Sequence, residues 1–110
     1  MTNSPGTTAG AGPTEPSEPA KPADLADVIA AAARSVPGVA DLHTGAFGEA
    51  ATYLPGRRVN GVQIRDDVTE VHLTLTWGAP VLATADEVRR VVSALVTTRV
   101  DITVEDVVGP

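Results

Sequence analysis

Residues 62–77, VQIRDDVTEVHLTLTW, hold two runs of alternating apolar and polar side chains on either side of Asp66-Asp67. This period of two is typical of strands with one buried face, so the sequence predicts a β-hairpin. Matching apolar with apolar residues and cation with anion sets its register. The predicted pairs are Val62–Leu73, Gln63–His72, Ile64–Val71 and Arg65–Glu70, with a four-residue loop at 66–69.

The second run predicts opposite characters for the two faces of the sheet. Its buried set is Val71, Leu73, Leu75 and Trp77. The other face is predicted to be polar and open, with Gln63, Arg65, His72, Thr74, Thr76 and Thr103. Such a face can simply be solvated, or it can be where a second copy of the chain packs.

Helical periodicity lies on both sides of the hairpin. A first helix is predicted from Asp24, acting as N-cap, until Pro37-Gly38 end it. The second is predicted to begin with the capping-box sequence TADE at residues 84–87. Val88, Val91, Val92 and Leu95 then form its apolar face.

Short strands complete the predicted fold. Residues 39–43 form one, and the position of Leu42 indicates that its even-numbered residues are buried. Residues 57–65 alternate as the first strand of the hairpin. Residues 100–105 alternate as the last strand, and the strand–helix–strand order suggests a right-handed crossover if this strand pairs in parallel with the strand before the helix. The order α-β-β-β-α-β predicts an α+β fold of two layers: a mixed sheet of about four strands with two helices on one face.

The chain divides into two predicted parts. Residues 1–23 are rich in proline, glycine and small polar residues, so they bury too little apolar surface to offset the entropy of ordering and should form a disordered tail. Residues 24–108 form the α+β domain.

Composition excludes several kinds of function. The chain has no cysteine, which rules out disulfides, zinc–thiolate sites and thiol catalysis. A net charge of −6 opposes nonspecific binding to nucleic acid or anionic lipid. No apolar run approaches the roughly 20 residues that cross a bilayer, so any membrane link is expected to be indirect.

The sequence offers no catalytic constellation. The only histidines, His43 and His72, are not at a metal-binding spacing. The carboxylate pairs Asp66-Asp67 and Asp86-Glu87 have structural explanations in a turn and a helix start. We therefore expect no enzyme activity and no cofactor.

The segment 44–56 is predicted to be a long loop, which is unusual in a compact domain and often functional. It carries two of the three aromatic side chains, so it is either a docking element or a fold-back that completes a thin core. Arg57, Arg58 and Arg65 can gather into a cationic patch beside it, or be paired with acidic neighbours. The residues predicted to bind a partner are Phe47, Tyr53, Leu54, Arg57 and Arg58.

Four motifs resemble one known family. They are VPGV at 36–39, YLPGRRVNGV at 53–62, WGAPV at 77–81 and VDITVEDV at 100–107. In this order, across residues 24–108, they are similar to the alkaline shock protein family of bacterial envelope stress proteins. The Tyr-Leu-Pro-Gly-Arg-Arg form is similar to short actinobacterial members.

The resemblance implies a non-enzymatic cytoplasmic protein of the envelope or general stress response. It implies a scaffold or adaptor that self-associates, or that a membrane-anchored protein partner recruits to the inner face of the membrane. The alternative is a nucleic-acid-binding module that uses the open sheet face. That module would need a basic stripe or stacking aromatics, which the predicted face lacks.

Overall fold

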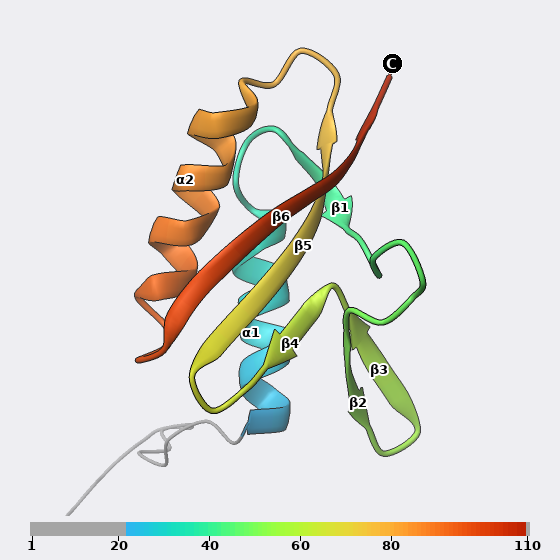
Figure 1. The fold of residues 1–110 in the computed structure, drawn as a ribbon, viewed down its shortest axis with the longest axis vertical. Helices are drawn as coiled ribbons and strands as arrows, with labels where there is room; N and C mark the ends of the chain where they lie inside the picture. The colour runs from blue at the N-terminus through green and yellow to red at the C-terminus, as the bar shows by residue number, and fades with distance from the viewer. Residues whose placement is uncertain (1–21, 110) are drawn as a thin grey trace, which may run out of the picture.

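The structure is a computed structural model that describes residues 22–109. Its elements are α1 (Pro22–Arg34), β1 (Val39–Leu42), β2 (Ala51–Leu54), β3 (Arg57–Asn60), β4 (Val62–Ile64), β5 (Val68–Thr76), α2 (Val81–Ser93) and β6 (Arg99–Val108) (Figure 1). The predicted tail, 1–23, lies outside the described residues except for its last two, which belong to α1. The predicted α+β class and the order of helices and strands are confirmed, with two additions: strand β2, and a break between β3 and β4.

β5 is the centre of the main, mixed sheet. It pairs in parallel with β6 on one side, as expected for strands joined by α2. On its other side it pairs antiparallel with β4 along its first half and with β1 along its second half. β2 and β3 form a separate two-stranded hairpin beside this sheet (Figure 1).

The core lies between one face of the sheet and the two helices. Val71, Leu73 and Leu75 of β5 are fully buried, as their alternation predicts. The helices contribute Ala26, Ile29, Ala30, Ala33, Val88 and Val92 to the same cluster. Trp77 was predicted on this buried face, but it is 73% exposed because β5 ends at Thr76 and the chain turns at Gly78.

The register of the β4–β5 hairpin differs from the predicted one by two residues. Val62 pairs with Val71 and Ile64 with Thr69. The amide of Arg65 donates to the carbonyl of Val68 at 2.9 Å, so the turn holds two residues instead of four. A shift of two keeps every side chain on its predicted face, which is why the apolar pattern could not detect it.

The predicted strand 57–65 is broken at Gly61, which adopts φ of +82°. The part before the break, β3, turns away from β5 and pairs with β2. The predicted loop 44–56 is therefore only partly a loop, because its last residues form β2 and the turn into β3.

β1 also departs from simple alternation. The pairing with β5 skips Ala40 between Val39 and Asp41, which marks a β-bulge. Leu42 is buried as predicted, and the bulge lets Val39, three residues earlier, pack against the core as well.

Both helices begin before their predicted starts. α1 begins at Pro22, so Asp24 lies within its first turn and is not the N-cap. α2 begins at Val81 with Pro80 in the N-cap position and no side-chain cap. The predicted capping box is therefore wrong: Thr84 is buried inside the first turns of α2, and its amide donates to the carbonyl of Pro80.

Candidate functional site

The β2–β3 hairpin brings the predicted partner-binding residues together. Tyr53 lies opposite Arg58 and Leu54 lies opposite Arg57. Because neighbouring residues of a strand point to opposite faces, Tyr53 and Arg58 share one face of the hairpin, while Leu54 and Arg57 share the other.

The second of these faces attaches the hairpin to α1. Leu54 packs against the core and Val59 belongs to it. The Arg57 guanidinium donates two hydrogen bonds to the Asp27 carboxylate of α1, at 3.0 and 2.7 Å. The Thr52 hydroxyl donates to the carbonyl of Val62 at 2.5 Å, which holds the hairpin to the start of β4. This face is structural.

The Arg57–Asp27 pair makes one contribution to stability dependent on pH. Hydrogen bonds from Arg57 and its positive charge hold the pKa of Asp27 below its ordinary value. A carboxylate with a lowered pKa stabilises the fold above the pKa that it has in the unfolded chain, and this contribution is lost as pH falls through the folded-state pKa.

We therefore expect Asp27→Asn to lower the melting temperature slightly at pH 7, since the pair is exposed to solvent. The difference from wild type should shrink below pH of about 4, where the aspartate of the unfolded chain becomes protonated. Thermal unfolding followed by circular dichroism at pH 7 and pH 3 measures both differences. An equal difference at the two pH values would contradict the role given to this ion pair.

The first face of the hairpin is open to solvent. Tyr53 is 68% exposed, and Arg58 is exposed and makes no ion pair with any residue that the structure describes. An exposed tyrosine beside an exposed arginine combines the two residue types that, with tryptophan, are most enriched at the energetic centres of protein interfaces.

A polar pocket of about 370 Å³ borders the hairpin where β3 approaches α1 and the end of β1. Its charged residues are Asp27, Arg34, Asp41, Arg57 and Arg58. Three arginines against two aspartates leave a surplus of one positive charge in a chain whose net charge is −6. The pocket can therefore accept a carboxylate from a partner.

The predicted cationic patch is only partly correct. Arg57 and Arg58 lie together, but Arg65 pairs with Glu70 on the main sheet, Nε to Oε2 at 3.1 Å. The third arginine at the pocket is Arg34 of α1, whose Nε lies 3.5 Å from Oδ1 of Asp41. Sequence reasoning missed it because α1 and β3 are distant in the chain, and no local pattern joins them.

Phe47 does not fold back into the core. Its side chain is 94% exposed, on the loop between β1 and β2. The loop is ordered locally by Glu49, whose carboxylate accepts from the Phe47 amide at 3.0 Å. Backbone amide groups of Glu49 itself and of Phe47, followed by the charges of His72 and His43, hold the pKa of Glu49 below its usual range. Of the two predicted core additions, only Leu54 packs against the core.

All three aromatic side chains of the chain are exposed. Trp77 directly follows the end of β5, where its amide donates to the carbonyl of Val108 at 2.8 Å. Leu82, at the start of α2, is also exposed, by 81%. This apolar end was not foreseen, because alternation placed Trp77 inside.

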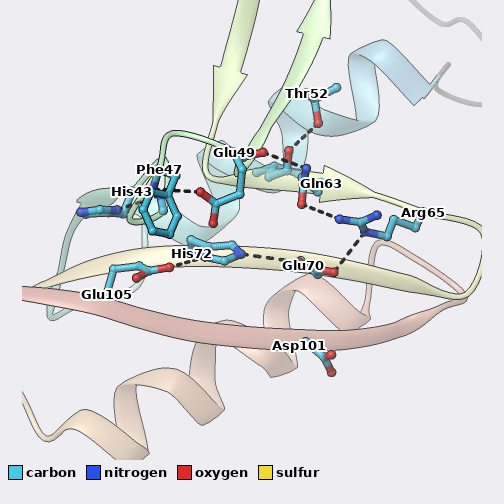
Figure 2. Close-up of polar contacts among 12 residues, drawn as sticks. His43, Phe47, Glu49, Thr52, Gln63, Arg65, Glu70, His72, Asp101 and Glu105 are labelled. Atoms are coloured by element: carbon cyan, nitrogen blue, oxygen red, sulfur yellow. Dashed lines mark hydrogen bonds and ion pairs between the residues drawn. The ribbon is translucent and has the colours of Figure 1, made fainter.

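The outer face of the main sheet is less open than predicted. His72 is only 8% exposed and Thr74 is buried, while Arg65, Thr76 and Thr103 are exposed. Figure 2 shows His72 beneath the loop that carries Phe47 and Glu49. The prediction of an exposed His72 is therefore wrong.

His72 lies between two carboxylates. Its Nδ1 is 2.6 Å from Oε2 of Glu105, and its Nε2 is 3.6 Å from Oε1 of Glu70 (Figure 2). Glu105 reaches the ring because it is the extra residue of a β-bulge in β6, between the partners of Leu73 and Thr74. Since both ring nitrogens face a carboxylate, His72 has its partners within the fold.

The remaining chemical candidates have local roles. His43 accepts a hydrogen bond from the Gly45 amide through Nδ1 at 2.9 Å. Asp86 pairs with Arg89, and Glu87 with Arg90, one turn further along α2. Among residues 22–109, no group of three or more histidine, aspartate or glutamate side chains is placed to hold a metal ion.

The acidic character of the outer face bears on nucleic acid binding. Glu70 and Glu105 lie at its centre beside His72, and Glu49 lies near them on the covering loop. Among the described residues of its strands, this face carries no row of basic side chains and no aromatic ring for stacking, the features that bind single-stranded nucleic acid. The sheet face thus gives no support to the nucleic-acid alternative.

The fold and the site define a small α+β domain with an exposed aromatic–arginine hairpin. Compared with known proteins, the chain matches no family model, no curated protein and no solved structure. In the part of the chain that the structure describes, no helix has both the length and the apolar character needed to cross a membrane.

Proposed function

We propose that this domain is a non-enzymatic scaffold or adaptor that self-associates and docks onto a membrane-anchored protein partner through the β2–β3 hairpin. The observation that carries the proposal is the exposed pair of Tyr53 and Arg58 on a hairpin outside the main sheet. The assignment to the envelope or general stress response, and to the cytoplasmic side of the membrane, rests on the resemblance of the four motifs to the alkaline shock protein family.

The two faces of the hairpin have different roles, which supports docking. One face is used to hold the hairpin to α1, through Leu54 and the bidentate Arg57–Asp27 pair. The hairpin is therefore fixed before a partner arrives, so binding does not have to order it. The other face keeps Tyr53 and Arg58 available to a partner.

The nearby pocket suggests the chemistry of the partner. Arg58 has no ion-pair partner among the described residues, and the pocket beside it carries a surplus positive charge. A partner segment that offers an acidic side chain to Arg58 and an apolar surface to Tyr53 would bind both residues. Phe47, on the preceding loop, is a further exposed apolar contact.

The test is capture of partner proteins from the protein's own cells by the tagged full-length chain. Replacing Tyr53 and Arg58 together by alanine should lower recovery of the captured partner about tenfold or more, since interface tyrosines and arginines often contribute over 1 kcal/mol each. Circular dichroism should remain native, because both side chains are exposed.

The matched control is the double variant Trp77→Ala and Arg89→Ala. It also removes one exposed aromatic and one exposed arginine, but at other surfaces. Recovery of the partner should be unchanged with this control. Equal recovery with both double variants would show that the hairpin is not the docking site.

A further inference from the structure

Among the residues that the structure describes, β6 forms an unpaired edge of the main sheet. β6 is ten residues long and pairs along one side only, with β5. Its other side makes no strand pairing with any residue that the structure describes. The regular part of β6, residues 99–104 before the bulge at Glu105, is a template on which a further strand can be added.

The side chains of β6 also remain incompletely covered. Ile102 and Val104 lie on the helix-facing side of the sheet and contact the core, yet both are only partly buried. On the adjacent strand, Leu73 and Val71 are fully buried. A strand added to the open edge would cover the apolar side chains of β6 in the same way.

We propose that two copies of the chain pair through the open edges of β6, antiparallel and related by a two-fold axis at Ile102. This arrangement joins the two main sheets into one continuous sheet. The cross-strand pairs are Arg99–Glu105, Val100–Val104 and Asp101–Thr103, each occurring twice, and Ile102 with its own copy. Arg99 of one copy then lies opposite Glu105 of the other at both ends of an apolar stripe. Within each copy Arg99 keeps its hydrogen bonds to Asp101, and Glu105 keeps its contact with His72, so the two charges attract across the strands without exchanging these partners.

The charges of β6 select this register. Acidic residues on an edge strand normally oppose pairing. An axis one residue earlier sets Asp101 opposite Asp101, and one residue later sets Asp101 opposite Glu105. An axis at Val104, two residues later, sets Ile102 opposite Asp106. An axis at Val100, two residues earlier, leaves only residues 99–101 of the strand paired.

A different argument disfavours pairings in which the helix-covered face of one copy's sheet lies on the same side as the outer face of the other copy's sheet. They set odd-numbered residues of one copy opposite even-numbered residues of the other, so the apolar side chains of β6 would meet the partner's polar face. The proposal rests on the self-association in the proposed function, and it assigns that association to β6 and leaves the hairpin available to the partner.

A cysteine substitution tests the position of the axis in the full-length chain, which has no cysteine of its own. In an antiparallel pair, opposed Cα atoms are about 4.5–5.5 Å apart, within the range for a disulfide. Ile102→Cys should therefore give a disulfide-linked dimer as the main species after mild oxidation. In the same register Thr103→Cys places its two copies about 8 Å apart, too far for a disulfide, and should stay uncross-linked.

Sedimentation equilibrium of the wild-type protein keeps the test decisive even if Ile102→Cys does not fold. We expect a dimer whose dissociation constant rises about tenfold or more with Arg99→Glu, because the substitution sets a glutamate opposite Glu105 and beside Asp101 at both ends of the stripe. Arg89→Glu, on the exposed side of α2, is the matched control and should leave the dimer unchanged.

Three results would overturn the proposal: a wild-type monomer at every concentration, a dimer that Arg99→Glu does not weaken, or equal cross-linking at the two cysteine positions. None of them depends on partner capture, because the purified protein contains no partner. Failure of β6 pairing is thus distinguishable from failure of the hairpin as a docking site.

Discussion

Replacing Gly61 with alanine is expected to lower the free energy of unfolding by about 2–5 kcal/mol, through backbone strain and overpacking. Gly61 adopts φ of +82°, which L-residues with a side chain rarely adopt. A Cβ at this position would lie 2.6 Å from Cβ of Leu42 and 2.9 Å from the carbonyl oxygen of His72. The Gly61 carbonyl also accepts from the His72 amide at 2.9 Å, so the backbone cannot shift freely.

Gly56→Ala is the matched control for this prediction. Gly56 has a similar φ of +75°, but nothing lies within 4 Å of a Cβ built there. It should therefore lose only the conformational term of about 1–2 kcal/mol. Urea denaturation of both variants separates strain from steric overlap. Equal losses of unfolding free energy in the two variants would show that steric overlap does not contribute at Gly61.

The second large effect is expected for Leu73→Ala. Leu73 is fully buried at the centre of β5, where β1 and β6 flank it. Removal of a buried leucine side chain leaves a cavity and typically costs about 2–5 kcal/mol. Since native proteins are stabilised by only about 5–15 kcal/mol, this loss is a large fraction of the total free energy of unfolding.

Leu82→Ala provides the comparison. It makes the same chemical change at a side chain that is 81% exposed, and it should alter the free energy of unfolding by less than about 0.5 kcal/mol. Denaturant midpoints of the two variants measure the contrast. A loss below about 1 kcal/mol for Leu73→Ala would contradict its place in the core.

The centre of the fold is predictable because its pattern is local. Alternation alone identifies the three fully buried apolar side chains of β5, Val71, Leu73 and Leu75. The strand–helix–strand order is compatible with the parallel pairing of β5 with β6, although it does not set which strands are neighbours. These inferences need only the period of two and the rules of chain connection.

Three errors share a different cause, which is that several local patterns fit equally well. The alternation changes phase at Gly61, from Val59 to Val62 and Ile64, but a β-bulge within one continuous strand would give the same change, so the sequence does not show that β3 leaves the main sheet. Arg65 and Glu70 suggested a direct pair, and they do form an ion pair, but diagonally, in a register shifted by two. The TADE sequence has capping-box spacing, although α2 already begins at Val81.

The sequence shows some members of the candidate site but not their geometry. The interface residue types are visible in the sequence, and the structure places Tyr53 beside Arg58. The structural role of Arg57 and the approach of Arg34 depend on how α1 packs beside β3, which no local pattern contains. The burial of His72 likewise depends on Glu105, 33 residues away, and on the loop above it.

The most direct test of the proposed docking function is cross-linked affinity capture of the tagged full-length protein from its own cells, separated into soluble and membrane fractions. We expect a specific partner protein in the membrane fraction that the Tyr53→Ala, Arg58→Ala variant loses and the Trp77→Ala, Arg89→Ala variant retains. Recovery of the wild type without any enriched partner in either fraction would contradict the adaptor function.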